Sequence, residues 1–427
     1  MHAATLLGSI LFACVAPCHG AATPGPAGIF VIGDTRTVPG EIAKFDFDFV
    51  AGYTLRTAWD SVETWDAARG APRRDFTRID ASLEELRARG KRMTLEVFID
   101  TIPDYVLALP GTVTWVNPHP TRGGIRVVPW DANALAAYTA FLQALSDHIV
   151  AGTAWRVADH PALQSVDAPI LGLQGLREIS NTLIAHPDYT RQRFVDGVLA
   201  AVHANRAAFP DKFGFLALFL MEDGTPSPSL DDTVLARLLA EFNHPGQPTL
   251  GFFQETLSDT GPTATGVGSL LAQASTETYI LFQALRPWVL VASDQGVRPP
   301  EIASATPLAG LERAWTQFRA PYVELYGADI LNTENHAGLR RWAAFLRAID
   351  DTQNHRDMPR LEQIAPGDYR LRWTDDAFLT RRLWSSPDLA TWSPLDLAEP
   401  LDGDVSVPSP ATGGKLFFRL ETQMPAR

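Results

Sequence analysis

The chain has 427 residues, of which 46% are hydrophobic and 20% charged, an ordinary globular balance that suits one large domain and a small one. Its formal net charge of -13 at pH 7 argues against nucleic acid as a partner, because phosphate backbones are bound by basic patches. Neutral and basic substrates are compatible with this charge.

Residues 1–22 have the pattern of a secretory signal peptide, with a compact apolar run that ends near Pro17 and small residues after it. The run is shorter than the roughly 20 residues needed to cross a bilayer. We therefore expect a bacterial protein exported to the periplasm or the medium, with no membrane span. Both cysteines, Cys14 and Cys18, lie in this segment, so the mature chain would have no thiol for a disulfide or a metal.

Short strand-like runs alternate with amphipathic helical stretches over residues 23–350. The predicted strands are 28–34, 52–59, 92–100, 168–175, 213–220, 249–256, 278–285 and 321–328. The predicted helices are 80–90, 132–150, 191–209, 231–243 and 338–350. This alternation predicts an α/β protein with a (β/α)8 TIM barrel. A doubly wound open sheet is the alternative, but no glycine-rich phosphate turn follows any of these strands.

The pattern changes after Asp351. Residues 351–360 are polar and have no apolar periodicity, so they are predicted to be a linker. Residues 361–427 contain short strand-like runs between turn residues, which predicts a small all-β, sandwich-like C-terminal domain. This domain is either a rigid spacer or stabilising cap, or a sugar-binding module that uses Trp373, Trp384 or Trp392.

Several segments occur in an order that is typical of one class of enzymes. The second predicted strand and the residues after it, "GYTLRTAWDSVETWD", contain an Arg-x-x-Trp-x-x-x-Glu pattern made by Arg56, Trp59 and Glu63. The loop "IPDYVLALPG" follows the third strand, and "VPWDANALAAYTAFLQALSDH" precedes the fourth. Over residues 28–350 this order resembles the (β/α)8-barrel glycoside hydrolases of the large retaining clan, especially the bacterial groups related to β-galactosidases. The resemblance implies a carbohydrate substrate.

Glycosidic hydrolysis needs one protonated and one ionised carboxyl, and the active sites of such barrels lie at the C-terminal ends of the strands. The resemblance places the proton donor at Glu178, after the predicted fourth strand. The clan has Asn directly before this glutamate, whereas this chain has Arg177, whose charge favours the ionised acid. A loop glutamate paired with Arg177 is the alternative interpretation.

The resemblance places the nucleophile at the end of the seventh strand, but that predicted strand carries Gln283, an amide that cannot act as one. Alternation along the eighth strand puts Tyr322, Glu324 and Tyr326 on one face, so Glu324 is the predicted nucleophile. Glu255, at the end of the sixth strand, is the alternative catalytic residue. A buried structural pair is the other interpretation of both glutamates, because an acid in an apolar strand is costly unless it is paired.

The predicted substrate-binding residues are polar or aromatic side chains near strand ends: Arg56, Trp59, Asp100, Gln283, Tyr322 and Tyr326. Glu96 faces the same side of the third strand as Asp100, and we expect it to pair with Arg56 inside the barrel. Further candidates for stacking on a sugar ring are Tyr105, Trp115 and Trp130.

The sequence has no HExxH spacing, no P-loop and no G-x-S-x-G elbow, so we expect no metal, no cofactor and no obligate protein partner. The leading hypothesis is an exported glycoside hydrolase that cleaves O-glycosidic bonds of an oligo- or polysaccharide with two carboxyls. The alternative is a catalytically inactive barrel that binds glycans or acts as a scaffold. The missing Asn-Glu pair and Gln283 favour that alternative.

Overall fold

The structure is a computed structural model. It describes residues 25–33, 40–119, 123–173, 181–219, 221, 223–224, 228–244, 247–263, 265–289, 302–353, 360–365, 368–372, 380–386, 391, 393–394, 404–407 and 417–423. The predicted signal peptide, residues 1–22, and the predicted proton donor Glu178 lie outside these residues. The chain divides into two compact units, one formed by residues 23–336 and one that contains residues 337–427.

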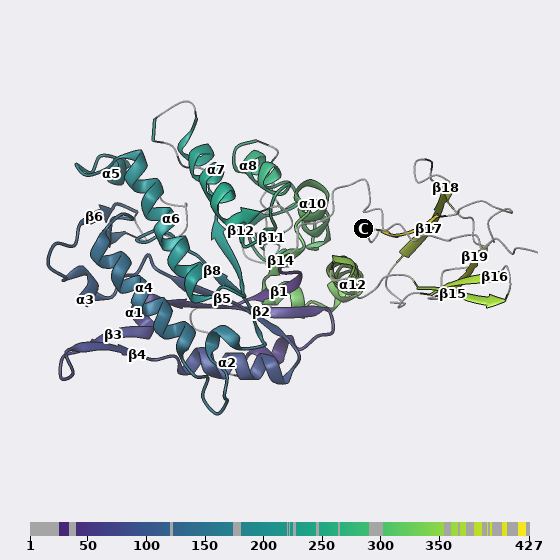
Figure 1. Ribbon diagram of the computed structural model, residues 1–427, viewed down its shortest axis with the longest axis horizontal. Coiled ribbons are helices and arrows are strands. Elements are labelled where there is room, and N and C mark those ends of the chain that lie inside the picture. Colours follow the sequence, from purple (N-terminus) through teal and green to yellow (C-terminus); the bar gives the residue numbers. More distant parts are fainter. Residues whose placement is uncertain are drawn as a thin grey trace, which may run out of the picture. The chain divides into compact units, whose positions relative to one another are not determined.

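The described residues of the first unit form a closed barrel of eight parallel strands that neighbour one another in chain order (Figure 1). The strands are β1 (Gly28–Ile32), β2 (Val50–Ala58), β5 (Arg92–Phe98), β8 (Leu163–Asp167), β9 (Phe213–Ala217), β12 (Leu250–Leu257), β13 (Ile280–Ala284) and β14 (Tyr322–Leu325). Strand β14 closes the barrel by pairing with β1, with Gly28 opposite Tyr322. The predicted TIM barrel is confirmed.

The fourth strand lies before the predicted one. We expected it at residues 168–175, but β8 ends at Asp167, and Ala168, Ile170 and Leu171 are fully buried in irregular backbone after it. The apolar run is therefore a buried loop at the end of the barrel. The true strand was missed because it turns Ser165 and Asp167 toward the barrel interior, which removes the apolar signal.

Helices connect the strands and lie outside the barrel (Figure 1). They are α2 (Thr77–Ala88), α4 (Ala132–Asp147), α6 (Arg191–Ala208), α7 (Leu230–Phe242), α8 (Val267–Ala274) and α10 (Leu308–Phe318). Helix α4 begins where the Asp131 side chain accepts a hydrogen bond from the Ala134 amide at 2.7 Å, and it buries Tyr138, Phe141 and Leu145 at helical spacing. A capping box between Ser229 and Asp232 begins α7 in the same way.

Shorter elements fill the connections. They are the helices α1 (Trp59–Val62), α3 (Asp104–Leu107), α5 (Asn181–Ile184) and α11 (Gly327–Leu331), the 3-10 turns η1 (Ile42–Phe45), η2 (Val157–Asp159) and η3 (Thr333–Asn335), and the paired strands β3 (Glu63–Asp66) with β4 (Ala71–Arg74), β6 (Thr114–Asn117) with β7 (Gly124–Val127), and β10 (Asn243–His244) with β11 (Gln247–Pro248). The β3–β4 hairpin follows β2, and α3 with the β6–β7 hairpin follows β5. These elements therefore belong to the C-terminal end of the barrel, where active sites of this fold lie.

The barrel interior is filled by large side chains from alternate positions of the strands. Phe30, Phe215, Phe253, Tyr279, Leu281 and Tyr322 form one buried cluster. Gly251 makes room for the Tyr279 ring, since a Cβ atom there would lie 2.2 Å from ring carbons. The Tyr279 hydroxyl donates a hydrogen bond to the Gly214 carbonyl at 2.5 Å, so the ring spans the interior without leaving its polar atom unpaired.

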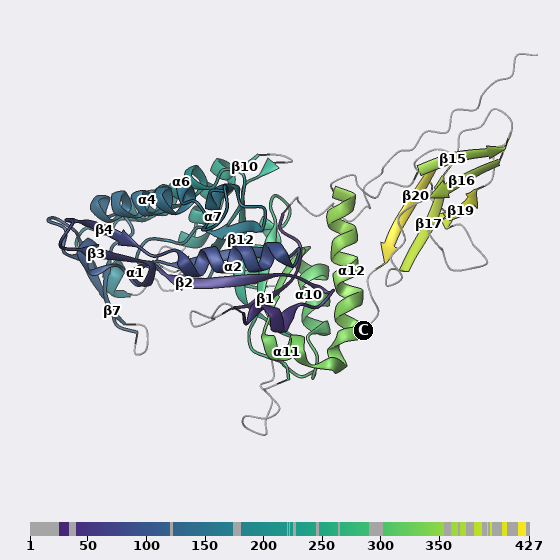
Figure 2. The same ribbon diagram turned by 90° about the horizontal axis from the view of Figure 1, so that it is seen from below.

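The second unit contains helix α12 (His336–Gln353) and two three-stranded antiparallel sheets (Figure 2). One sheet has the order β15 (Arg360–Ala365), β16 (Asp368–Arg372), β19 (Asp404–Val407), and the other β18 (Ser393–Pro394), β17 (Thr380–Ser386), β20 (Phe417–Gln423). Among the described residues after residue 360, the C-terminal region contains strands and no helix, in agreement with the all-β prediction, while α12 continues three residues into the predicted linker. Trp384 lies on β17, opposite Pro394 and Arg419; Trp373 and Trp392 lie outside the described residues. In the part of the chain that the structure describes, no helix has the length and apolar character of a membrane span.

Candidate active site

The inner faces of the strands bring acidic residues together at the C-terminal end of the barrel. Arg56 and Glu96 are register partners in β2 and β5, and Gln283 and Glu324 are register partners in β13 and β14. The interior position of β8 contributes Asp167, and that of β12 contributes Glu255. Four carboxyls therefore share this end of the barrel with the guanidinium of Arg56.

Arg56 connects opposite sides of the site. Its Nε donates a hydrogen bond to Glu96 Oε2 at 2.7 Å, and its Nη2 donates one to Gln283 Oε1. The same Nη2 lies 3.6 Å from Glu324 Oε2. The pair between Arg56 and Glu96 was expected from the sequence and is confirmed.

Glu324 is fully buried beneath this arginine. Its Oε1 accepts hydrogen bonds from the Thr54 hydroxyl at 2.6 Å and from the Tyr322 hydroxyl at 2.7 Å. Burial raises the pKa of Glu324 to about 8, and the charge of Glu96 adds to this effect, while Arg56 and the two hydroxyls oppose it. Glu324 is therefore a largely protonated acid at neutral pH.

Beneath Glu324 lies a layer of hydroxyl groups. The Tyr322 hydroxyl is within 2.9 Å of Thr94 Oγ1, and Thr94 Oγ1 is 2.8 Å from the Ser165 hydroxyl. All of these groups are buried. Buried hydroxyls are costly unless they are hydrogen-bonded, and this chain of contacts satisfies them while it orients Glu324.

Glu96 is buried as well, with 3% of its surface exposed. Desolvation raises its pKa, the nearby Arg56 lowers it, and the negative charge of Glu255 raises it again. Glu96 Oε1 and Glu324 Oε2 have no hydrogen-bond partner within the described residues. The protein thus leaves one oxygen of each carboxyl without a hydrogen bond, which adds to the cost of ionising these buried acids.

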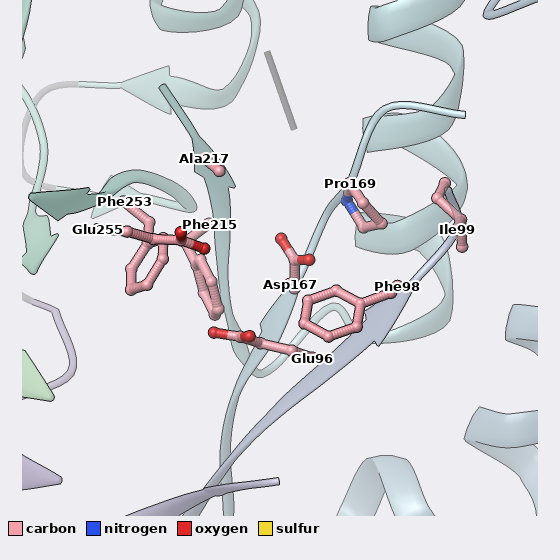
Figure 3. Close-up of a pocket in the computed structure, with 9 residues that line it drawn as sticks. All are labelled: Glu96, Phe98, Ile99, Asp167, Pro169, Phe215, Ala217, Phe253 and Glu255. Atoms are coloured by element: carbon pink, nitrogen blue, oxygen red, sulfur yellow. The ribbon is translucent and has the colours of Figure 1, made fainter. Parts of the chain in front are cut away.

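Asp167 and Glu255 lie on the walls of a pocket above this layer, with Glu96 beside them. The pocket is small and partly open to solvent, and its other walls are mainly apolar and aromatic, formed by Phe98, Ile99, Pro169, Phe215, Ala217 and Phe253. In Figure 3 the three carboxyl groups are directed toward a common space. Apolar walls with a few convergent polar groups are typical of binding sites for small molecules.

The surroundings of Asp167 favour its protonated form. Desolvation raises its pKa well above the ordinary range, although the residue keeps some exposure toward the pocket. The charges of Glu96, Glu255 and Glu324 raise this pKa further, and Arg56 opposes them. The sequence prediction missed Asp167 because the fourth strand was placed too late. The Ser165–Asp167 alternation was the signal that could have found it.

Other predicted residues occupy different surroundings. Trp59 is fully buried, its Nε1 bonds to Glu63 Oε1 at 3.1 Å, and its ring packs against Tyr138 and Phe141. It is therefore a core residue, with no free ring face for a sugar. Asp100 lies 3.5 Å from Arg126 in an ion pair.

Tyr326 hydrogen-bonds to Gln283, beside Arg56, and burial raises its pKa. Tyr322 is fully buried in the hydroxyl layer and does not line the pocket. The structure thus brings Arg56, Glu255, Gln283, Tyr322, Glu324 and Tyr326 to one end of the barrel. No group of three or more His, Cys, Asp or Glu residues within the described ranges has the arrangement of a metal site.

The three further aromatic residues that were predicted to stack on a sugar ring also contact other residues of the protein. Trp115 is buried and its Nε1 bonds to the Val127 carbonyl at 3.1 Å. Trp130 packs edge-on against His186 and Tyr189. Tyr105 donates its hydroxyl to Glu63 at 2.5 Å and packs against Trp65, a residue that the sequence prediction did not consider.

Comparison with known proteins gives fold-level similarity at low sequence identity. No family model and no curated protein matches the chain. The chain is similar to the β-galactosidase from Rahnella sp. R3 (10% identity, 80% of this chain and 59% of that one, TM-score 0.48). It is also similar to the endo-β-1,4-mannanase from Thermotoga petrophila (10% identity, 91% of each chain, TM-score 0.46) and to a xylanase from Cellvibrio japonicus (14% identity, 71% and 86%, TM-score 0.41).

At identities of 14% or less, these similarities do not show what the protein does. Its activity has to be inferred from the residues of the barrel.

Proposed function

We propose that the protein is an exported glycoside hydrolase in which Asp167 donates a proton to the leaving oxygen and Glu255 acts as nucleophile or base. The supporting observation is the convergence of Glu96, Asp167 and Glu255 on one pocket at the C-terminal end of the barrel. A general acid must hold its proton at the working pH, and the raised pKa of Asp167 supplies this property.

The charge of the site fits the same reaction. Glycosidic bond cleavage passes through a transition state with positive charge on the sugar ring. With Asp167 and Glu324 protonated, the carboxylates of Glu96 and Glu255 face the single cation of Arg56, and the resulting negative potential in a partly desolvated pocket stabilises developing positive charge. Arg56 keeps Glu96 in place and limits the repulsion among the acids.

Glu324 has a supporting role in this proposal. It is fully buried and does not line the pocket, so a sugar would have to displace protein to reach it. Its position beneath Arg56 instead helps to hold the guanidinium that pairs with Glu96. The sequence predicts Glu178 as the proton donor instead of Asp167. The experiment therefore tests both residues.

The test is a screen of the full-length protein on aryl β-glycosides and on plant and algal polysaccharides, with D167N, E255Q, E324Q and E178Q variants. Loss of a general acid or its partner lowers the rate by about 10²–10⁴, so D167N and E255Q should lose nearly all turnover. The alkaline limb of the pH–rate profile should disappear in D167N, and E324Q should keep more activity than either.

Loss of activity in E178Q with an unaffected D167N would show that the sequence prediction names the true donor. The anomeric form of the first product, read by NMR, separates the two roles of Glu255: retention requires a nucleophile and inversion a base.

A barrel that binds glycans without cleaving them is the second candidate, and Gln283 favours it, because an amide bound to Arg56 occupies the end of the seventh strand. Calorimetry distinguishes the two. Binding of an oligosaccharide with no turnover, unchanged in D167N and E255Q, would support the binding protein and contradict the hydrolase.

A further inference from the structure

An exposed tryptophan lies in the connection after β2. Trp65 has 48% of its surface exposed, although a tryptophan in a folded protein is usually well buried. It lies on β3, and alternation puts it on the same face of the hairpin as Glu63, with Pro72 opposite Trp65 and Arg74 opposite Glu63. This face contacts α3, where the ring of Tyr105 lies 5.3 Å from that of Trp65, tilted by 31°.

The support beneath Trp65 is rigid. Glu63 is fully buried and accepts hydrogen bonds from Trp59 Nε1 at 3.1 Å, from Arg74 Nε at 2.5 Å and from the Tyr105 hydroxyl at 2.5 Å. This arrangement fixes the hairpin on one side and Tyr105 on the other. An exposed indole in a fixed orientation loses little conformational entropy on binding, which favours recognition of a flat apolar surface.

The position of Trp65 relates it to the proposed active site. Its hairpin follows β2, which carries Arg56, after the short helix α1, and its partner Tyr105 follows β5, which carries Glu96. Both connections leave the same end of the barrel, on the left in Figure 1. A ligand that continues beyond the pocket over these connections would therefore reach Trp65.

We propose that Trp65, supported by Tyr105 and Pro72, is a stacking site for a pyranose unit of an extended oligosaccharide chain. The C–H face of a pyranose ring is flat and apolar and packs on an indole, while its hydroxyls stay in water. The proposal rests on the proposed function in taking carbohydrate as the ligand, and it adds that the substrate is a chain rather than a single sugar.

The experiment is calorimetric titration of the full-length protein with glucose and with β-1,4-linked hexasaccharides of glucose, mannose and xylose, in which wild type and variants at residue 65 all carry E255Q so that no hexasaccharide is cleaved. W65A should weaken binding of the hexasaccharide that the wild type binds by about five- to tenfold, the size of one aromatic contact. W65F should recover part of the loss. Binding of glucose should be the same in wild type and variants.

The matched control is W155A. Trp155 is also exposed, at 39%, but the Arg87 guanidinium lies 5.5 Å from its ring centre, and it belongs to the connection between α4 and β8, at the opposite end of the barrel. W155A should leave hexasaccharide binding unchanged. Thermal melts of W65A and W155A confirm that both variants are folded.

Equal hexasaccharide binding by wild type and W65A, or no binding of any hexasaccharide to the wild type, would overturn the proposal. Turnover separates this result from failure of the proposed function. If wild type and W65A cleave aryl glycosides and hexasaccharides equally well and bind hexasaccharides equally tightly, the protein is a hydrolase and Trp65 is not a stacking site. If hexasaccharide binding depends on Trp65 but no substrate is cleaved, Trp65 is a stacking site and the protein is not a hydrolase.

Discussion

Glu63 and Glu324 are both fully buried glutamates of the barrel unit, but their surroundings differ in kind. Three donors from β4, α1 and α3 satisfy both oxygens of Glu63. Glu324 has two hydroxyl donors on one oxygen and an arginine at 3.6 Å from the other, which has no hydrogen-bond partner within the described residues. The first carboxyl is a structural anchor, whereas the second belongs to a cluster of acids that repel one another.

The difference teaches how to separate structural from functional acids in this fold. Burial alone does not distinguish them, because both are inaccessible. What distinguishes them is whether the protein supplies enough donors for the charged form. A buried acid whose pKa is raised by neighbouring acids is characteristic of active sites, where the protein holds charges together at a cost in stability.

The arginine partners give the largest expected contrast. R56M removes the cation that faces both Glu96 and Glu324, so at pH 9 it should lower the free energy of unfolding by about 3–5 kcal/mol. R74M removes one of three donors to Glu63 and should cost about 1–3 kcal/mol. Urea unfolding at pH 5 and pH 9 measures both. The cost of R56M should shrink at pH 5, because the acids then hold protons; an equal cost at both pH values would contradict the charge-cluster interpretation.

Neutralising the anchor should destabilise the protein. E63Q keeps the size of the side chain but removes the charge that Arg74 and Tyr105 contact, so we expect a loss of about 1–3 kcal/mol at pH 7. Thermal unfolding followed by circular dichroism measures this loss. A variant as stable as the wild type would show that the three hydrogen bonds do not hold the hairpin.

Neutralising Glu324 should change the pH dependence of stability instead. Its pKa is about 8 in the folded protein and near 4.5 ordinarily, so between these values the unfolded chain releases a proton that the folded protein keeps. Stability from this group therefore falls as pH rises from 4.5 to 8, by up to about 1.4 kcal/mol per pH unit. E324Q should remove this slope. Unfolding at four pH values from 5 to 9 tests it, and an unchanged slope would contradict the raised pKa.

The smallest effect is expected for the hydroxyl layer. Y322F removes the hydroxyl that lies near Thr94 and bonds to Glu324, at a cost of about 0.5–1.5 kcal/mol. That hydrogen bond lowers the pKa of Glu324, so without it the fall in stability with rising pH should continue to a higher pH. Unfolding curves of Y322F across the same pH range measure both effects, and a curve identical to that of the wild type would assign no role to this hydroxyl.

The sequence was sufficient to predict the barrel because most of its strands are apolar runs with a clear period. It was also sufficient to predict that Arg56, Glu255 and Glu324 gather, since their strand ends are recognisable. It failed for Asp167, because a short strand with a polar inner face precedes a longer, fully buried apolar loop, and burial produces the same apolar signal as a strand. It also failed for Trp59, since nothing in a single sequence distinguishes a buried indole from one that faces a ligand.

The Glu63 anchor has a consequence for how this barrel can be altered. Connections at the active end of a TIM barrel are normally treated as independent modules that can be exchanged one at a time. Here a single carboxylate ties the connection after β2 to the one after β5. Exchanging either connection alone would remove hydrogen bonds to Glu63. The two connections therefore have to be exchanged together in an engineered barrel.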